Sequence, residues 1–199
     1  MRIIAIATVL LSGATASADA TTFRARFSVA EVDGAPVRSR AWIDEQIAKA
    51  NEVFEPAEIA FEVAEVTTIP DEEGRWPEDL VTRADRHRLG PLVEPDVINV
   101  FVVKSMADVD VPGQFIRGVH WRSRRGGSPR HYAILSSIAG SYVLAHELGH
   151  FFGNPHSPTP GNIMSYERAE GPPFFDARQL RRVRQHKERF IRTRELVPV

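Results

Sequence analysis

Apolar and polar residues alternate over residues 22–32, which is the pattern of a strand with one buried face. That face would consist of Phe23, Ala25, Phe27 and Val29. The spacing then changes to that of an amphipathic helix over residues 41–54, and a second strand is predicted over residues 59–69. The apolar face of the helix would consist of Trp42, Ile43, Ile47, Ala50 and Phe54.

The middle of the chain predicts a short helix and three more strands. Residues 96–103 form a nearly continuous apolar run, which is typical of a strand covered on both faces. A polar loop over residues 70–77 and a short helix over residues 80–89 precede this run. Residues 114–121 and 131–136 are predicted as an antiparallel hairpin around an arginine- and glycine-rich turn.

The last third of the chain predicts two helices around an irregular segment. An apolar helix is expected from about Tyr142, whereas two prolines and a glycine exclude a helix over residues 157–162. Asp176 is the expected N-cap of an amphipathic helix that runs to Ile191. Its inward face would consist of Ala177, Leu180, Val183 and Phe190. The order of elements predicts a mixed α/β (α+β) protein, with a sheet backed by helices and an irregular lower part.

The first residues have the layout of a secretory signal peptide. Arg2 precedes an apolar run over residues 3–11, and small residues then permit cleavage after Ala18 or after Ala20. The run is about half of the ~20 residues that cross a bilayer, so we expect no membrane anchor after cleavage. Residues 1–18 are therefore expected to be removed, and residues 19–199 to form a single domain of a secreted or periplasmic protein.

Composition and charge narrow the possible functions. The chain contains no cysteine, so disulfides cannot stabilise it after export. The net charge is −1, but residues 19–80 sum to −9 and residues 81–199 to +7. A basic second half is compatible with an exported protein that binds polyanions through Arg181–Arg194. No aromatic residues alternate with the basic ones as a base-stacking surface requires, so we interpret them as a solvated helix face and expect no nucleic-acid partner.

The segment YVLAHELGHFFGNPHS carries three histidines and a glutamate among apolar residues. His146 and His150 are four residues apart, so a helix places both rings on one face, where they can bind one metal ion. Glu147 is rotated by roughly 100° from His146, so it flanks such an ion and can hold a water molecule there.

His156 can reach the same ion only if the chain turns back after the helix. Gly153 is the residue that permits this turn, because helices commonly end at a glycine in the left-handed conformation. Three neutral histidines leave a fourth tetrahedral position for water, which is typical of a catalytic zinc site.

The segment HELGHFFGNPH resembles the zinc motif HExxHxxGxxH of the metzincin metalloproteases at every fixed position. The sequence NIMSY, residues 162–166, is similar to the Met-turn that follows this motif in metzincins. The resemblance implies Zn²⁺ ligands at His146, His150 and His156, with Glu147 as the general base. It also implies that Met164 forms an apolar floor beneath the metal.

Two residues are similar to different metzincin subfamilies. Tyr166 corresponds to the tyrosine that approaches the zinc in astacins and serralysins, and it is therefore a candidate catalytic residue. Ser157 is similar to the residue that matrixins place after the third histidine, so the chain is assigned to no subfamily. The family fold implies a twisted, mixed five-stranded sheet, an active-site helix, an irregular lower part and a C-terminal helix. Residues 114–121 would be the edge strand that holds an extended substrate.

The resemblance thus predicts a secreted, monomeric zinc endopeptidase that acts on peptides or proteins with a zinc-activated water. A chain without a cysteine-containing propeptide is expected to be active when released, or restrained by a separate protein inhibitor. Two alternatives stay open: a zinc-binding but non-proteolytic or narrowly specific peptide-binding protein, and the polyanion-binding protein. The histidines outside the motif have no partner at ligand spacing and are expected to be surface or satisfied residues: His87, His120, His131 and His186.

Overall fold

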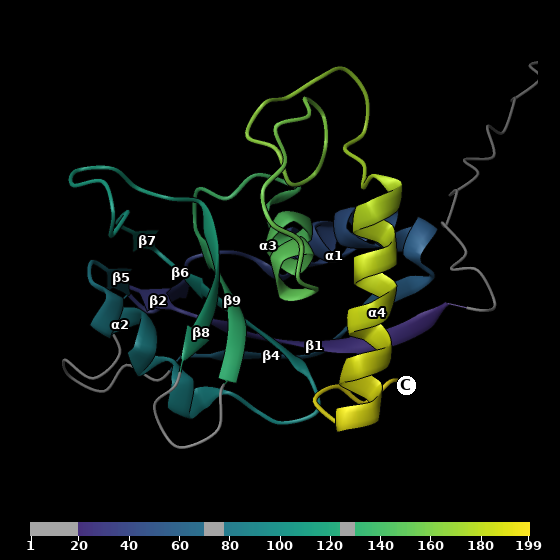
Figure 1. The fold of residues 1–199 in the computed structure, drawn as a ribbon. Helices are drawn as coiled ribbons and strands as arrows, with labels where there is room; N and C mark the ends of the chain where they lie inside the picture. The colour runs from purple at the N-terminus through teal and green to yellow at the C-terminus, as the bar shows by residue number, and fades with distance from the viewer. Residues whose placement is uncertain (1–19, 70–77, 124–129) are drawn as a thin grey trace, which may run out of the picture.

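The chain is built around a five-stranded sheet with the strand order β4-β1-β6-β9-β8 (Figure 1). The computed structural model describes residues 20–69, 78–123 and 130–199. The predicted signal segment, the loop over residues 70–77 and most of the arginine- and glycine-rich turn lie outside the described residues. Strands β1 (Thr21–Val29), β4 (Ile59–Thr68), β6 (Ile98–Val103) and β9 (Arg130–Ser136) are parallel, and β8 (Gly118–Ser123) is an antiparallel edge strand. The predicted mixed five-stranded sheet is confirmed.

Both faces of the sheet are covered, as the hydrophobic pattern predicts. The predicted apolar face of β1 lies in the main core and consists of Phe23, Ala25, Phe27 and Val29. Strand β6 lies between β1 and β9 and is buried along its whole length, as expected from its continuous apolar run.

Three helices pack on the main face of the sheet: α1 (Arg40–Phe54), α3 (Val143–Phe151) and α4 (Ala177–Thr193). Helix α1 begins where Ser39 Oγ accepts a hydrogen bond from the N–H of Trp42, at 3.3 Å. None of the helices in the described parts of the chain is long and apolar enough to span a membrane.

Phenylalanine rings connect these helices to one another. The ring centroids of Phe54 and Phe152 are 5.6 Å apart, and those of Phe151 and Phe190 are 5.3 Å apart. Burial of a large apolar side chain is worth about 1.5–3 kcal/mol. This aromatic cluster therefore fixes α3 between α1 and α4, and α3 carries the candidate metal ligands.

A smaller core covers the opposite face of the sheet, beneath α2 (Arg83–Arg88), η2 (Gly90–Leu92), β5 (Asp79–Leu80) and β7 (Ser105–Met106). The remaining short elements are β2 (Glu31–Val32), β3 (Ala35–Pro36) and η1 (Glu55–Ala57).

The predicted helix over residues 80–89 begins later than expected. Thr82 is its N-cap and forms a capping box with Asp85, so the first helical residue is Arg83. Leu80 instead pairs with Met106 in the short parallel ladder between β5 and β7. The hydrophobic spacing did not distinguish a buried strand residue from the first apolar residue of a helix.

The edge strand also begins later than predicted, at Gly118 and not at Gln114. Arg117 still accepts a hydrogen bond from the N–H of Ser136 on β9, at 2.9 Å, but the residues before it bind the preceding loop. The N–H of Asp108 donates to the carbonyl of Gln114 at 2.8 Å, and the N–H of Ile116 donates to the carbonyl of Met106 at 2.9 Å. These bonds fold residues 105–117 into a wall beside β8.

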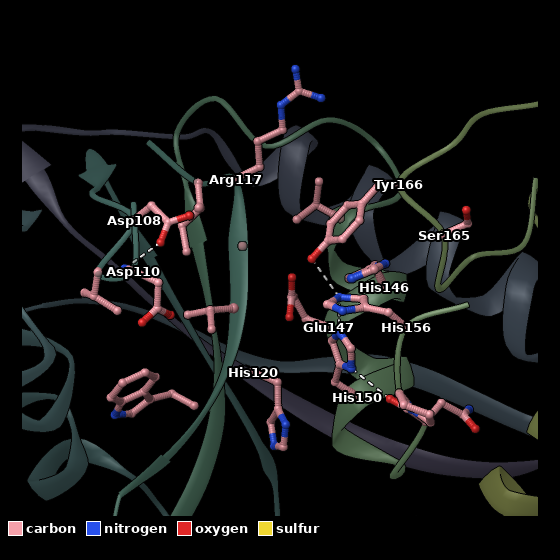
Figure 2. Close-up of a pocket in the computed structure, with 18 of the residues that line it drawn as sticks. Asp108, Asp110, Arg117, His120, His146, Glu147, His150, His156, Ser165 and Tyr166 are labelled. Carbon is pink, nitrogen blue, oxygen red and sulfur yellow. Dashed lines mark hydrogen bonds between the residues drawn. The ribbon is translucent and has the colours of Figure 1, made fainter. Parts of the chain in front are cut away.

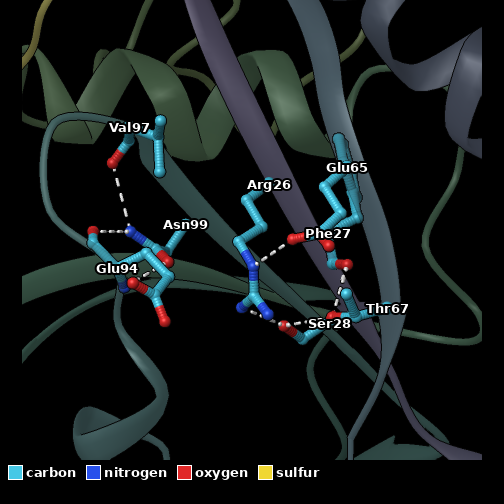
Figure 3. Close-up of polar contacts among 8 residues, drawn as sticks. All are labelled: Arg26, Phe27, Ser28, Glu65, Thr67, Glu94, Val97 and Asn99. Atoms are coloured by element: carbon cyan, nitrogen blue, oxygen red, sulfur yellow. Dashed lines mark hydrogen bonds and ion pairs between the residues drawn. The ribbon is translucent and has the colours of Figure 1, made fainter.

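Buried polar groups within the sheet have local partners (Figure 3). On β6, the amide of Asn99 donates to the carbonyls of Glu94 and Val97, at 2.8 and 3.1 Å, and accepts from the N–H of Glu94 at 2.9 Å. Because a buried polar group without a partner costs about 1–3 kcal/mol, these bonds allow the buried strand β6 to include Asn99. On the exposed part of the sheet, Arg26 Nε on β1 donates to Glu65 Oε2 on β4 at 2.9 Å.

The N-terminus of α4 is attached to the segment before Met164 by two buried amides. Asp176 and Gln179 form a capping box, so the predicted N-cap is confirmed. Asn162 Nδ2 donates to Gln179 Oε1 at 2.7 Å, and Gln179 Nε2 donates to Asn162 Oδ1 at 3.1 Å. Asn162 Oδ1 also accepts from the N–H of Met164 at 2.9 Å.

The inward face of α4 includes Val183 and Phe190 as predicted, but Ala177 is exposed. At about 100° per residue, Ala177 lies roughly 120° around the helix axis from Val183. Gln179 occupies the inward position of the first turn instead.

Replacing Gln179 by Leu should remove both hydrogen bonds between Gln179 and the buried Asn162 amide. Asn162 Nδ2 then loses its partner, and the free energy of unfolding should fall by about 1–3 kcal/mol. Chemical denaturation measures the change. Gln185→Leu, at an exposed position of the same helix, should change stability by less than about 0.5 kcal/mol. Equal losses in the two variants would show that the amide pair does not stabilise the fold.

Candidate active site

Helix α3 presents two of the predicted ligands on one face. The ring centroids of His146 and His150 are 4.8 Å apart, and both rings line the main cleft (Figure 2). Glu147 lies between them in the sequence, and its side chain also lines the cleft although only 4% of the residue is exposed. The i, i+4 spacing therefore places the two rings as a helix requires.

The helix ends at Phe151, five residues before His156. Gly153 has a φ of +86°, in the left-handed region that favours glycine. The N–H groups of Gly153 and Asn154 donate back to carbonyls in the last turn of the helix, each at 2.9 Å, which is the Schellman pattern of helix termination. The His186 ring of α4 occupies the space that a side chain at Gly153 would need.

The turn at Gly153 returns the chain to the helix and brings three histidines together. His146, His150 and His156 each offer a ring nitrogen, and these atoms lie within 4.8 Å of one another. The Nε2 atoms of His150 and His156 are 3.0 Å apart. In the described ranges, no other group of three or more histidine and acidic side chains could hold a metal ion.

The hydrogen bonds of the imidazoles fit a metal ion at this point. His146 Nδ1 donates to the carbonyl of Ile163 at 2.7 Å, and His150 Nδ1 donates to the carbonyl of Asn154 at 2.8 Å. Because a carbonyl only accepts, each Nδ1 carries the proton and each Nε2 has a free lone pair. Three imidazole donors at this spacing suit Zn²⁺, whose nitrogen ligands lie about 2.0–2.1 Å from the ion.

Burial shifts the pKa values of the three histidines and of Glu147. Burial lowers the pKa of His150 to about 4, with a further contribution from His146. Burial also lowers the pKa values of His146 and His156. The imidazoles are thus neutral at neutral pH, as metal binding requires. Burial raises the pKa of Glu147 to about 8, and a divalent cation nearby would favour its carboxylate form.

The segment after the histidines folds beneath and beside them. Met164 is completely buried and packs against Gly149 of α3. The N–H of Ser157 donates to the carbonyl of Met164 at 2.9 Å, which joins the His156 loop to this turn. Tyr166 is 78% exposed, and its hydroxyl lies 2.9 Å from His156 Nε2.

The edge strand β8 lies against Glu147, a contact that the sequence did not predict. The backbone N–H of His120 lies near the Glu147 carboxylate and partly opposes the rise in its pKa that burial causes. A Cβ atom on Gly118 would lie 2.6 Å from Val143 Cγ1 and 2.8 Å from Glu147 Oε1, so only glycine fits. A glycine within a predicted strand was the available signal, because such glycines often mark a close approach.

The candidate ligands open onto a cleft of about 1110 Å³. Figure 2 shows Asp108, Asp110 and Arg117 on one side of this space, and Tyr166 with the histidine cluster on the other. Strand β8 runs along the cleft as the free edge of the sheet. An extended peptide can pair with such an edge through main-chain hydrogen bonds.

The histidines outside the cluster have partners of their own, as expected from the sequence. His120 Nε2 lies 2.9 Å from His131 Nδ1, and His131 Nε2 lies 2.6 Å from Glu195 Oε1. Burial lowers the pKa of His120 to about 2, and the bond to His131 lowers the pKa of Glu195. His87 and His186 also make hydrogen bonds.

Solved structures share this fold. Metalloproteinase-II from Bacteroides fragilis superposes with a TM-score of 0.57 and 16% identity over 86% of this chain, which spans 55% of the length of that protein. Tannerella forsythia mirolysin, in complex with a cleaved peptide, superposes with a TM-score of 0.61 and 12% identity, over 91% of this chain and 100% of that protein. Archaemetzincin from Methanopyrus kandleri superposes with a TM-score of 0.51 and 17% identity, over 89% of this chain and 99% of that protein.

These likenesses confirm the predicted fold, which is that of the metzincin-type metallopeptidases. No protein-family model matches the chain, and no curated protein matches it in sequence.

Gly118→Ala should push the side chains of Glu147 and Val143 away from β8, because the new methyl group would lie within 3 Å of both. We expect a loss of about 1–3 kcal/mol in the free energy of unfolding, as for other overpacked sites. Denaturation measures the loss, and a crystal structure of the variant shows the displaced carboxylate. Gly140→Ala is the matched control, because a Cβ there meets no atom within 4 Å. A Gly118→Ala protein with unchanged stability and an unmoved Glu147 would contradict this account.

Proposed function

We propose that this protein is an exported zinc endopeptidase, in which His146, His150 and His156 hold the metal. The observation that carries the proposal is the convergence of three neutral imidazoles next to a buried glutamate, in a cleft bordered by a free strand edge. The fold of metzincin-type metallopeptidases supports it. Export, cleavage of residues 1–18 and a single, monomeric domain over residues 19–199 remain proposals from the sequence.

Glu147 acts as the general base in this proposal. Zn²⁺ at the three imidazoles supplies Lewis acidity, which polarises a carbonyl group and acidifies water. The Glu147 carboxylate accepts a proton from the attacking water and passes it to the departing amine. The His120 N–H lies near this carboxylate and favours its charged form, which is the form that accepts a proton. Burial, which favours the protonated form of Glu147, suits a group that must hold a proton between the two steps.

Tyr166 donates a hydrogen bond to the oxyanion that develops on the scissile carbonyl. Its hydroxyl lies 2.9 Å from His156 Nε2, the atom that would bind the metal. Since that nitrogen has a single lone pair, Tyr166 and a metal ion compete for it. Metal binding therefore releases the phenol toward the substrate, and its exposed position leaves it free to move.

The substrate lies along β8 as an additional strand. The mirolysin structure, which superposes on this chain, is a complex with a cleaved peptide, and a peptide is the ligand that a free strand edge suits best. Pairing through the main chain places few demands on the substrate sequence. Side-chain selectivity must therefore come from the walls of the cleft.

Glu147→Gln should keep about one zinc ion per chain and lower kcat for cleavage of an unfolded protein such as casein by about 10²- to 10⁴-fold, because the amide cannot accept the proton. Elemental analysis and a cleavage assay measure the two quantities. Glu170→Gln, at an exposed position, is the control and should match the wild type. Full activity in Glu147→Gln would refute the mechanism, and a zinc-loaded wild type inert on every peptide would favour a non-proteolytic binding protein.

Tyr166→Phe should lower kcat by about 10²-fold, the usual effect of losing one donor to an oxyanion. Zinc content should stay the same, because the phenol is not needed to position the imidazoles. Steady-state kinetics and metal analysis of the same preparation test both statements. A Tyr166→Phe enzyme with unchanged kcat would assign the phenol a purely structural role.

A further inference from the structure

Some of the charged side chains around the main cleft have partners within its walls, and others do not. Seven charged residues line it: Arg86, Asp108, Asp110, Arg117, Arg122, Glu147 and Arg168. The two aspartates have partners within the wall. Asp110 pairs with Arg83 at 2.5 Å, and Asp108 Oδ1 accepts the N–H groups of Asp110 and Val111 at 2.8 and 3.2 Å. Their charges are therefore used to hold the loop.

One of the four arginines is structural. Arg86 is 2% exposed, its guanidinium lies over the ring of Trp121, and its Nη2 donates to the carbonyl of Ala107 at 2.7 Å. The other three are exposed, and their side chains make no hydrogen bond or ion pair with any described residue: Arg117, Arg122 and Arg168. The cleft therefore has three guanidinium groups that pair with no acidic side chain in the described parts of the chain.

Arg168 lies beside the candidate metal ligands. It follows Tyr166 by two residues, and its charge contributes to the lowered pKa of His146. It also lines a second hollow, of about 150 Å³, whose other lining residues are uncharged: Tyr142, Gly161, Ala169, Gly171 and Pro173. Arg168 therefore borders both spaces, and in the second hollow it is the one charged lining residue among those described.

Arg117 and Arg122 lie at the two ends of the substrate edge. Arg117 precedes the first residue of β8, and Arg122 is the next-to-last residue of that strand. Five residues of extended chain separate them, or roughly 16 Å. A peptide paired along β8 would therefore have a cation near each end, with Arg168 across the cleft beside the site of cleavage.

We infer that the preferred substrates are acidic peptides, and that Arg168 binds the carboxylate of an Asp or Glu next to the scissile bond. This inference rests on the proposed peptidase activity and adds its substrate class. Arginine suits the role because its guanidinium binds a carboxylate through two parallel hydrogen bonds. The same three cations disfavour lysine- and arginine-rich segments through like-charge repulsion.

The test uses one peptide scaffold with Glu, Gln or Lys at each position around the cleavage point, and the zinc-loaded enzyme. The wild type should cleave the best Glu peptide with a kcat/KM roughly tenfold to a hundredfold above that of its Lys counterpart, as expected for one charged hydrogen-bonded pair. This advantage should shrink at high salt, because the pair is partly exposed. At the peptide position next to the scissile bond, Arg168→Glu should reverse the order of the Glu and Lys peptides, and Arg168→Gln should abolish the preference.

Arg178→Glu is the matched control, because Arg178 is an exposed arginine that does not line the cleft. It makes the same change in net charge and should keep the wild-type preference. A structural role of Arg168 would lower activity on all peptides equally, whereas the inference requires an inversion of selectivity. Equal kcat/KM for Glu and Lys peptides in the wild type would overturn the inference and leave the proposed activity standing.

Binding to the zinc-loaded Glu147→Gln protein provides a readout that does not depend on catalysis. A fluorescein-labelled Glu peptide should bind roughly tenfold more tightly than the Lys peptide, and Arg168→Glu in that background should reverse the order. If the wild type cleaves nothing while this binding preference is present, the peptidase proposal fails and the acidic-ligand site stands. Equal affinities would overturn the acidic-ligand site.

Discussion

A straight helix can direct two imidazoles at one point, but a third must come from another part of the chain. The path of the chain after α3 follows largely from that constraint. Helix α3 stops at Phe151, Gly153 takes the left-handed conformation, and the chain returns with His156. The carbonyls of Ile163 and Asn154, which fix the other two rings, belong to the same turned segment. Helix α4 supports the turn through His186 and through the amide pair of Gln179 and Asn162.

The sheet serves this centre from the other side. Its edge strand β8 places the His120 N–H near the Glu147 carboxylate and has a glycine where a side chain would displace that carboxylate. The same strand is the free edge along which a peptide can pair. In the proposed enzyme, binding and proton transfer would thus depend on one strand, and a shift of β8 would disturb both. Burial of the Glu147 carboxylate is unfavourable in free energy, but it occurs where a proton acceptor with a raised pKa is useful.

Loops and turns, by contrast, would set the selectivity of the proposed enzyme. Asp108 and Asp110 are engaged by the N–H groups of their own loop and by Arg83, whereas the side chain of Arg168, in the segment after Met164, has no such partner among the described residues. This division is common in enzymes, because loops can change charge without disturbing the core that positions the chemistry. In the proposed enzyme it separates the residues that would hold the metal from those that would select the peptide.

Local patterns in the sequence determined much of this protein. Alternation identified the buried face of β1, and the apolar run identified β6. The spacing of His146, His150, Gly153 and His156 predicted the convergence of the three imidazoles and the break in α3. These features depend on residues close together in the chain. Tertiary structure decided where β8 and α2 begin, that Ala177 faces solvent, that Gly118 makes room for Glu147, and which arginines lack partners. Each of these depends on atoms that are distant in sequence, so no local period or propensity could report them.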